Sequence, residues 1–283
     1  MDDSKIFIVG ANGQLGTELQ KQYPNAQSAD IDELDITNKE SVENYDWSNI
    51  DVIINAAAYT NVDGAETEGR AAAWMVNADA VANLVAVAAQ HDAVLVHIST
   101  DYVFDGTQDN HTEDEPFAPL SVYGASKAAG DVTVSLAPQF YILRTSWVIG
   151  AGNNFVRTMM SLANKDISPA VVSDQIGRLT FTSELVAAID HLLTKKPAFG
   201  TYNVSNTGES ASWADITREI FSLMERDDLT VTDSTTEEYF KDKPEAAPRP
   251  LLSTLALDKI EATGFSGTPW KTALQSYVKE ENS

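Results

Sequence analysis

The sequence predicts an α/β fold: a doubly wound parallel sheet with helices on both faces, and a smaller lobe in the C-terminal part. Three observations support this prediction. Short apolar segments rich in β-branched residues alternate with helical segments, which is typical of βαβ units. The first apolar segment runs directly into a glycine-rich turn. The alternation becomes irregular in the last third of the 283 residues, where most of the prolines lie.

The composition is that of an ordinary globular protein. Hydrophobic residues make up 43% of the chain and charged residues 22%, which is enough apolar material for a large core. The absence of cysteine excludes disulfides, thiolate catalysis and zinc–cysteine sites. The acidic start is unlike a signal peptide, and no apolar run approaches the length of a membrane span. We therefore expect a soluble, cytoplasmic protein with no membrane partner.

The formal net charge of −23 restricts the partners of the protein. Its acidic residues are spread along the chain, so the surface repels polyanions and we expect no nucleic-acid partner. A substrate that carries phosphate groups would need donors placed locally against this background field. Adaptation to high salt and adaptation to an acidifying cytoplasm are both open as reasons for the charge.

The first strand is expected over residues 5–9, and a glycine-rich turn follows it. GANGQLG places glycines at 10, 13 and 16. In a dinucleotide-binding turn, Gly10 permits the tight bend, Gly13 lets the backbone approach a pyrophosphate and Gly16 lets the helix pack on the strand. The N-terminus of that helix adds free N–H groups for phosphate. The sequence thus predicts a Rossmann-type dinucleotide site, in the G-x-x-G-x-x-G spacing typical of short-chain reductases.

The second strand and its connection are expected within AQSADIDELDIT, residues 26–37. An acidic residue at the end of this strand normally binds the adenosine ribose hydroxyls. Asp30 is the candidate, with Asp32 second. Neither is followed closely by the arginine that a 2′-phosphate would favour, so local chemistry favours NADH over NADPH, and both remain candidates for the cofactor.

The third strand is expected after Asp51, and it breaks into small residues at 55–58. Small side chains at the carboxyl end of a parallel strand let a cofactor lie close to the backbone, although tight packing alone would also select them. The alanine-rich segment 71–91 is expected to form a long amphipathic helix. Residues 93–100 then form another apolar strand, which ends at Thr100.

SVYGASKAAGD, residues 121–131, is expected to begin a helix with Tyr123 and Lys127 four positions apart. Side chains at this spacing lie on one helix face. A nearby ammonium favours the phenolate, so we expect Lys127 to lower the pKa of the Tyr123 phenol from its usual value of about 10 toward neutral pH. The phenol would then be a usable proton donor. By itself, the Y-x-x-x-K pattern is also common on ordinary solvent-exposed helix faces.

The rest of the chain continues the strand–helix pattern and then loses it. Strand, loop and helix follow one another in 171–193 and again in 200–224. We predict a dinucleotide-binding domain over residues 1–150, to which segments at about 171–200 return, and a mainly substrate-binding lobe over residues 151–283.

Three features point to one site at the carboxyl edge of the sheet. The glycine turn indicates a dinucleotide, Thr100 supplies a hydroxyl at a strand end, and Tyr123 with Lys127 supplies an acid. A hydroxyl and a phenol beside a nicotinamide suit hydride transfer to a carbonyl, whose oxygen needs a proton and hydrogen-bond donors as negative charge develops. We therefore predict an oxidoreductase that uses NADPH or NADH, with Thr100, Tyr123 and Lys127 as its catalytic residues.

Taken together, the motifs of the chain resemble those of the dTDP-4-dehydrorhamnose reductases, a family of extended short-chain dehydrogenases/reductases. The match runs nearly from end to end. Its most specific parts are INAAAYTNVDGAE, STDYVFDG and PRPLLSTL, at residues 54–66, 99–106 and 248–255. The other matching segments are GANGQLG, LDIT, SVYGASKAAGD, RTSWVIG, VVSDQIGRLT and GTYNVSNTGESASW.

The resemblance implies reduction of the 4-keto group of dTDP-6-deoxy-L-lyxo-4-hexulose to give dTDP-L-rhamnose, the last step of dTDP-L-rhamnose synthesis. It implies that Tyr123 donates the proton, that Lys127 lowers the phenol pKa and holds the nicotinamide ribose, and that Thr100 binds the reacting oxygen. The substrate contacts that it implies are Thr100, Asp101, Tyr102 and Trp147 at the sugar and Arg249 at the diphosphate.

Two of these contacts have plainer interpretations. A tryptophan at a strand end often fills a core, although an indole face also packs well on a sugar ring. Arg249 is one of few cations in the last third of the chain, but it would also suit an ordinary protein surface.

The cofactor contacts that the resemblance implies are Gly10, Gly13, Gln14, Leu15 and Gly16 at the glycine turn, Asp30 at the adenosine ribose, Asp35 and Ile36 at the adenine, Ala57, Ala58 and Thr60 at the middle of the cofactor, and Tyr123 with Lys127 at the nicotinamide end.

The chain departs from the family pattern at four positions. Leu179 stands where a proline is usual, Ser121 stands where an asparagine is common, and Asn61 and Gly64 vary the segment after the third strand. None removes a chemical group, so these departures concern the substrate loops and not the reaction. Some family members form dimers through a magnesium ion held by glutamates. Those glutamates cannot be placed in this sequence, so no metal is predicted, and we expect a monomer or a homodimer.

Two other functions stay open at this stage. One is an extended reductase or epimerase that acts on a different nucleotide sugar, against which STDYVFDG and RTSW count. The other is a non-catalytic regulatory subunit that keeps a nucleotide site on the same fold. That function predicts a damaged catalytic set, whereas Thr100, Tyr123 and Lys127 are all present.

Overall fold

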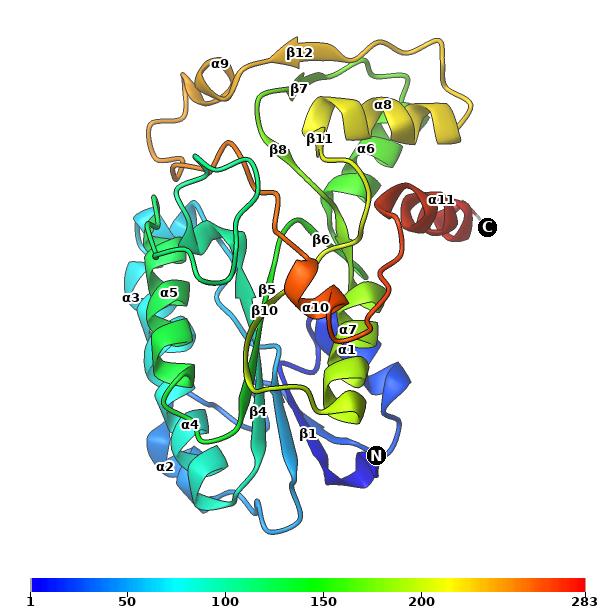
Figure 1. The fold of residues 1–283 in the computed structure, drawn as a ribbon. Helices are drawn as coiled ribbons and strands as arrows, with labels where there is room; N and C mark the ends of the chain where they lie inside the picture. The colour runs from blue at the N-terminus through cyan, green and yellow to red at the C-terminus, as the bar shows by residue number, and fades with distance from the viewer. Residues whose placement is uncertain (1, 283) are drawn as a thin grey trace.

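The structure, a computed structural model that describes residues 2–282, is built on one six-stranded parallel sheet (Figure 1). The strand order is β10-β5-β4-β3-β1-β2, and every neighbouring pair is parallel. The chain adds β2 on one side of β1 and then crosses to build the other side, so the sheet is doubly wound, as predicted. The strands are β1 (Ile6–Val9), β2 (Gln27–Ala29), β3 (Val52–Asn55), β4 (Val94–Thr100), β5 (Phe140–Thr145) and β10 (Gly200–Asn203).

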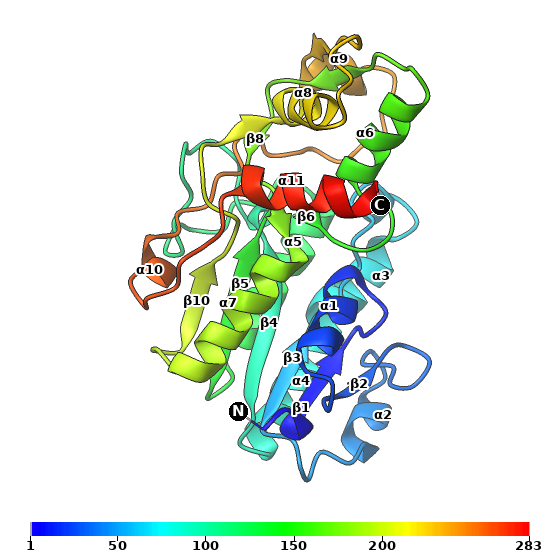
Figure 2. The same cartoon turned by 90° about the vertical axis from the view of Figure 1, so that its right-hand side faces the viewer.

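Different helices cover the two faces of the sheet (Figure 2). Along β1 the side chains alternate, so Ile6 and Ile8 pack on one face while Phe7 and Val9 pack on the other. Because both faces are covered, β1 reads as a continuous apolar run. The first face carries α1 (Gln14–Gln22), α7 (Thr182–Lys195) and α10 (Asp258–Glu261), and the second carries α2 (Lys39–Asn44), α4 (Ala80–Gln90) and α5 (Val122–Val134).

Residues 70–90 form one continuous helix, made of α3 (Arg70–Trp74), the π-helical turn η3 (Met75–Asp79) and α4. By length and composition alone, this 21-residue helix could cross a membrane. The expectation that no apolar run approaches that length is therefore wrong. In this structure the helix packs on the second face of the sheet through residues such as Leu84 and Val87, and core helices of this kind pass the same test.

A second part of the molecule, the upper lobe, lies beyond the carboxyl ends of the strands (Figure 1). It has its own apolar core, which includes Met159, Phe181, Phe221 and Trp270. Its strands form three short two-stranded pairs, β11 with β8, β12 with β7 and β6 with β9. The elements of the upper lobe are β6 (Val148–Ile149), α6 (Phe155–Asn164), β7 (Ala170–Val172), β8 (Ile176–Gly177), β9 (Thr180–Phe181), β11 (Ala211–Ser212), α8 (Trp213–Leu223), β12 (Thr232–Ser234), α9 (Thr236–Phe240) and α11 (Trp270–Glu281).

The chain passes between the two parts more than once. α7 follows β9 directly and lies on the sheet, and β10 forms the sheet edge beside β5. The chain then returns to the upper lobe in β11 and α8. The division into domains at residue 150 stays a prediction. Three short helical turns complete the described elements: η1 (Asp3–Lys5), η2 (Gly64–Glu66) and η4 (Asp101–Val103).

The carboxyl ends of four central strands meet beneath the upper lobe. These strands end at Val9, Asn55, Thr100 and Thr145. The segments that follow them are the glycine turn, the small residues after β3, η4 and the turn that contains Trp147. Parallel sheets bind their ligands at this edge, so the fold brings the predicted motifs to one side of the molecule.

Candidate active site

Two adjoining cavities form a trough at the carboxyl edge of the sheet. The first cavity, of about 460 Å³, lies beside the ends of β1 and β2. The second cavity, of about 770 Å³, lies over the ends of β4 and β5. Asn12, Gly13, Ala56 and Ala58 line both, so the trough is continuous across the glycine turn. An extended dinucleotide has the shape that such a trough admits.

The glycine turn brings the backbones of β1, α1 and the segment after β3 close together. Gly10 has a φ of +80°, and a Cβ there would lie 2.7 Å from the Ala57 nitrogen, so glycine is required. A Cβ on Gly16 would lie 2.1 Å from the Gly10 oxygen. Gly16 lines neither cavity, so it allows the helix to pack on the strand. Gly13 caps α1 without a side-chain hydrogen bond, which leaves N–H groups at the helix start for phosphate.

The first cavity holds the residues predicted at the adenosine end. Asp30 follows β2, and its carboxylate accepts hydrogen bonds from the Asn12 and Ile31 backbone nitrogens at 2.9 and 2.8 Å. This position beside the glycine turn is that of a ribose-binding acid. Asp32 does not line the cavity. The predicted cofactor residues that do line it are Gly10, Gly13, Asp30, Asp35, Ile36, Ala57 and Ala58.

The second cavity holds the residues predicted to react and to bind the sugar. They come from the end of β4, from η4, from α5 and from the turn after β5. Arg249 is the one predicted substrate residue that does not line it. The predicted residues that line it are Gly13, Gln14, Leu15, Ala58, Thr60, Thr100, Asp101, Tyr102, Tyr123, Lys127 and Trp147.

Two side chains cap the start of α5, the helix that carries the predicted catalytic pair. Ser121 is the N-cap, and its Oγ accepts a hydrogen bond from the Gly124 nitrogen at 3.1 Å. Serine and asparagine cap helices about equally well, which explains why the departure at Ser121 is tolerated. Glu66 of η2 accepts a second hydrogen bond, from the Val122 nitrogen at 2.7 Å. Tyr123 therefore lies in a first turn that is held from two directions.

The surroundings of Tyr123 raise the pKa of its phenol well above the usual value. Loss of solvent around the hydroxyl is the largest cause; hydrogen bonding by Thr100 lowers the pKa, and the carboxylates of Asp101 and Asp131 raise it. The expectation that Lys127 brings this pKa toward neutrality is therefore wrong for this structure. The phenol keeps its proton at neutral pH, which is the state that a proton donor needs.

Lys127 is almost completely buried, with 2% of its surface exposed. Its Nζ donates to the Ile98 carbonyl at 2.7 Å and lies 3.5 Å from His97 Nε2. Burial lowers the pKa of Lys127 to about 8, and the Asp131 carboxylate opposes that shift. Asp131 is itself paired with Arg144, at 2.9 Å. The Lys127 amine can therefore gain and lose a proton at mildly alkaline pH.

Four buried polar atoms in the wall of the second cavity have no hydrogen-bond partner in the described part of the chain. They are Gln14 Oε1, Ser99 Oγ, Asp101 Oδ2 and Thr145 Oγ1. Buried polar atoms without partners are rare in folded proteins. Hydroxyl and amide groups of a bound nicotinamide riboside and sugar would satisfy Gln14, Asp101 and Thr145, whereas Ser99 Oγ faces the buried Asp131 carboxylate. The residues present therefore fit both ligands. Among residues 2–282, no group of three or more His, Asp or Glu side chains is placed to hold a metal ion.

Trp147 forms part of a rigid aromatic wall. Its φ of 48° lies in the left-handed region that residues with side chains seldom adopt. Its indole stacks on Trp213 of α8, with ring centroids 3.7 Å apart and planes 17° apart. Trp213 is fixed in turn because its Nε1 donates to Gln175 Oε1 at 3.2 Å. Backbone strain of this kind persists only where the surroundings hold it.

A third cavity, of about 490 Å³, lies in the upper lobe and shares Trp213 with the second. Arg249 lines this cavity. Its guanidinium pairs with Asp63 at 2.8 Å, donates to the Ala247 carbonyl at 2.6 Å and lies 4.7 Å from the centre of the Phe240 ring. The residue predicted to contact the diphosphate therefore lines a cavity next to the second one, and in this structure its guanidinium is paired with the Asp63 carboxylate.

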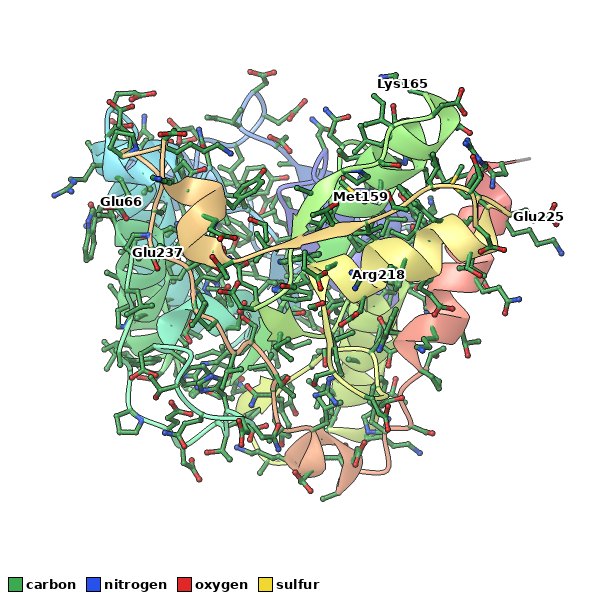
Figure 3. All side chains as sticks on the ribbon, turned by 90° about the horizontal axis from the view of Figure 1, so that it is seen from above. Glu66, Met159, Lys165, Arg218, Glu225 and Glu237 are labelled. Atoms are coloured by element: carbon green, nitrogen blue, oxygen red, sulfur yellow. The ribbon has the colours of Figure 1, made fainter. Side chains whose placement is uncertain are left out.

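The third cavity is a feature next to the candidate site that the sequence did not reveal. Its wall comes from α6, α8 and α9, among other segments; Figure 3 shows these three helices from above, marked by Met159, Arg218 and Glu237. Trp213 and Gln175 lie in segments that the family resemblance covers, without a predicted role. An aromatic residue directly after a helix-capping serine was the available signal for Trp213.

Comparison with known proteins identifies a family and close relatives. The family model described as RmlD substrate binding domain matches residues 4–283. A dTDP-4-dehydrorhamnose reductase from Aggregatibacter actinomycetemcomitans is 40% identical, over 96% of this chain and 98% of that protein.

Two solved structures are similar over nearly their whole length. The dTDP-4-dehydrorhamnose reductase from Bacillus anthracis, solved in complex with NADP, has a TM-score of 0.89 and 38% identity, and the match covers 97% of this chain and 98% of that one. The corresponding protein from Clostridium acetobutylicum has a TM-score of 0.91 and 38% identity, and the match covers 98% of this chain and 99% of that one.

Proposed function

This chain belongs to the family described as RmlD substrate binding domain, and we propose that it is an NAD(P)H-dependent dTDP-4-dehydrorhamnose reductase. It reduces the 4-keto group of dTDP-4-dehydrorhamnose to give dTDP-L-rhamnose, the last step of dTDP-L-rhamnose synthesis. The similarity to reductases of this name over nearly the whole chain supports the activity.

The observation that carries the proposal is the content of the second cavity. A hydroxyl from Thr100, a phenol from Tyr123 and an amine from Lys127 line one space that continues into a trough beside the glycine turn. This set supports reduction of a carbonyl, because the oxygen must receive a proton and hydrogen bonds while the carbon receives a hydride. When bound, the nicotinamide supplies that hydride.

Tyr123 donates the proton in the proposed reaction. Its raised pKa keeps the phenol protonated at neutral pH, so the proton is present on the phenol when negative charge develops on the carbonyl oxygen. Thr100 binds the same oxygen. Its hydroxyl accepts the Tyr102 N–H at 3.2 Å and lies 3.1 Å from Asp101 Oδ1, so its position is fixed before the substrate arrives.

The sugar lies against the wall made by Trp147 and Trp213. An apolar sugar face packs on an indole that is already held in place, so little side-chain entropy is lost on binding. Asp101 Oδ2 has no partner among the described residues, and it accepts a hydrogen bond from a sugar hydroxyl. Tyr102 completes this side of the cavity.

The nucleotide end of the substrate occupies the third cavity. Trp213 belongs to both cavities, so a diphosphate that passes this residue connects a sugar in the second cavity with a nucleoside in the third. Arg249 exchanges Asp63 for the diphosphate, since guanidinium groups bind phosphate strongly. The aromatic rings of Phe155, Tyr239 and Phe240 line the same cavity and offer faces for a base.

The cofactor site is open to both nicotinamide dinucleotides. Asp30 stands at the ribose end, and neither lysine nor arginine is among the residues that line the first cavity. This arrangement favours NADH, because a 2′-phosphate would meet a carboxylate without a compensating cation. The choice between monomer and homodimer, and the cytoplasmic location, stay predictions.

A coupled assay tests the proposed function. The purified protein is incubated with dTDP-4-keto-6-deoxyglucose and a 3,5-epimerase, with NADH or NADPH in parallel, and the product is identified by NMR. We expect oxidation of the cofactor and formation of dTDP-L-rhamnose. Turnover only with UDP-hexuloses in a parallel panel would instead indicate another nucleotide-sugar reductase. Cofactor binding without turnover of any sugar would indicate a regulatory subunit.

A further inference from the structure

Two buried polar side chains, Asn55 and His97, lie below the active site and connect to Lys127. Asn55 ends β3 and lies directly opposite His97 of β4 in the parallel pairing. Their exposed fractions are 1% and 0%. Asn55 Nδ2 lies 3.1 Å from His97 Nδ1, and His97 Nε2 lies 3.5 Å from Lys127 Nζ.

The hydrogen bonds of Asn55 determine which nitrogen of His97 carries a hydrogen. Asn55 Oδ1 accepts the backbone N–H of Ala57 at 3.1 Å, which fixes the orientation of the amide. The amide nitrogen therefore faces His97, and since it can only donate, His97 Nδ1 must accept. A neutral imidazole carries one hydrogen. That hydrogen is on Nε2, the nitrogen nearest to Lys127.

The His97 ring is neutral in this environment. Burial lowers the pKa of His97 well below its usual range, and the neighbouring Lys127 lowers it further. An imidazolium would also place a hydrogen on Nδ1, where it would meet the Asn55 amide hydrogens. Geometry and burial therefore favour the same form of the ring.

We propose that Asn55 and His97 are positioning residues that hold an N–H group against the Lys127 nitrogen, so that this lysine acts as a proton carrier and not as a permanent ammonium. The inference rests on the proposed function, because it assigns a task to Lys127 within that reaction. An ammonium is repelled by an N–H that faces it, whereas a neutral amine accepts a hydrogen bond from it.

Some groups around Lys127 favour its ammonium form, and others favour its neutral amine. Asp131, on the same helix, favours the ammonium, but it is shared with Arg144 of β5 at 2.9 Å. Tyr123 and, beyond it, Asp101 of η4 face the same cavity. His97, from β4, is the side chain that favours the amine.

The proposed role balances the protons of the reaction. The O–H bond of Tyr123 breaks when its proton passes to the sugar oxygen. The Lys127 ammonium then gives a proton to the phenolate, and the amine that remains accepts the N–H of His97. A proton from water restores the ammonium. Since Lys127 must begin as an ammonium, the rate is expected to fall as pH rises through its pKa of about 8.

The first test measures the tautomer in the unmodified protein. Nitrogen-15 NMR of histidine-labelled protein distinguishes a protonated from a bare ring nitrogen. We expect His97 to show hydrogen on Nε2 and none on Nδ1, without titration between pH 5 and 9. A ring with its hydrogen on Nδ1, or one that titrates in this range, would overturn the proposal. This test does not need turnover, so it is separate from failure of the proposed function.

The second test inverts the tautomer. In Asn55→Asp, one carboxylate oxygen still accepts the Ala57 N–H, while the other requires a hydrogen on His97 Nδ1, so Nε2 becomes an acceptor for the Lys127 ammonium. We expect the alkaline limb of the kcat/KM profile to move up by roughly one pH unit or more. The same NMR experiment should show hydrogen on Nδ1 in this variant.

A double variant separates the effect of the His97 ring from the effect of the charge added at position 55. Asn55→Asp combined with His97→Met keeps the new carboxylate but removes the imidazole. Two shifts of the alkaline limb are compared: from the unmodified protein to Asn55→Asp, and from His97→Met to the double variant. We expect the second shift to be smaller than the first. Equal movements in the two backgrounds would show that charge alone acts and would overturn the proposal. Cofactor affinity and thermal unfolding check that each variant is folded.

Discussion

The trough and the third cavity are built in different ways. The trough is made by short motifs that each follow a strand of one sheet, and backbone atoms and glycines form much of its wall. The third cavity is made by segments that are far apart in the chain, from Asp63 to Arg249. An ion pair between these two residues connects the segment after β3 with the segment after α9.

This difference determines how each region responds to amino-acid substitution. Strand pairing places the ends of β1, β3, β4 and β5 at one edge regardless of the loops that follow. The third cavity depends on single side chains such as Arg249 and Trp213, which can change their partners. We therefore expect the trough to hold the chemistry and the third cavity to adjust affinity for the substrate.

The largest expected effect is on the chemistry in the trough. Tyr123→Phe removes the proton donor but keeps the ring, so we expect kcat to fall by about 10³-fold, with cofactor affinity unchanged. Steady-state kinetics and cofactor titration by fluorescence measure the two quantities. Tyr141→Phe is the matched control, because Tyr141 is a buried tyrosine whose hydroxyl donates to the Pro197 carbonyl, away from the trough. Full activity in Tyr123→Phe would remove this residue from the mechanism.

A second effect in the trough is a pH-dependent cost to stability. Burial raises the pKa of Asp101 from 3.8 to about 6. The folded state therefore keeps a proton that the unfolded state has lost, so stability decreases as pH rises from about 4 to about 6 and stays lower above that range. Asp101→Asn removes this titration. At pH 7.5 its free energy of unfolding should be higher by up to about 3 kcal/mol, which thermal unfolding detects as a higher melting temperature.

The same measurement at low pH is the control for Asp101. Below about pH 4 the carboxyl is protonated in both states, so the gain in stability of Asp101→Asn should disappear there. A gain that is equal at pH 4 and pH 7.5 would contradict the assignment of the effect to ionisation.

The next effect belongs to the third cavity and concerns affinity. Arg249→Ala removes the proposed diphosphate contact, and we expect KM for the dTDP-sugar to rise about 30-fold, since a hydrogen bond to a charged group contributes about 2 kcal/mol. kcat and cofactor affinity should change little. Arg218→Ala is the matched control, since Arg218 is paired with Asp215 and Asp233 on the outer side of α8 and does not line the cavity. Equal KM values for the two variants would place the diphosphate elsewhere.

The smallest expected effect is at the wall that the two cavities share. Trp213→Leu removes the ring that supports Trp147, and an aromatic pair contributes about 1 kcal/mol beyond its buried area. We expect KM for the sugar nucleotide to rise several-fold, with the binding of cofactor alone unaffected. If cofactor binding weakens as much as substrate binding, the wall belongs to both regions and the contrast between them is weaker than we propose.

The sequence predicts the fold and the trough well because both rest on local patterns. The apolar runs at residues 6–9 and 52–54 and the glycine turn identify their elements directly. Thr100 ends β4, and Tyr123 lies in the first turn of α5, the helix that connects β4 with its parallel neighbour β5, so both reach one cavity at the same edge of the sheet.

The remaining features depend on tertiary contacts between side chains. The partner of Arg249 is Asp63, which is 186 positions away, and no sequence pattern connects them. The stacking of Trp147 on Trp213 joins segments of two different strand–helix units. The direction of the Tyr123 pKa shift also follows from burial and from Asp101 and Asp131, which the spacing of Tyr123 and Lys127 does not show.

The path of the chain between the sheet and the upper lobe has a consequence for unfolding. α7 and β10 are sheet elements inserted between segments of the upper lobe, with β9 before them and β11 after them. Separation of the two parts would pull on both ends of this insertion, so neither part can melt while the other stays intact. We expect a single cooperative transition, in which a ligand bound in either part raises the melting temperature of the whole chain.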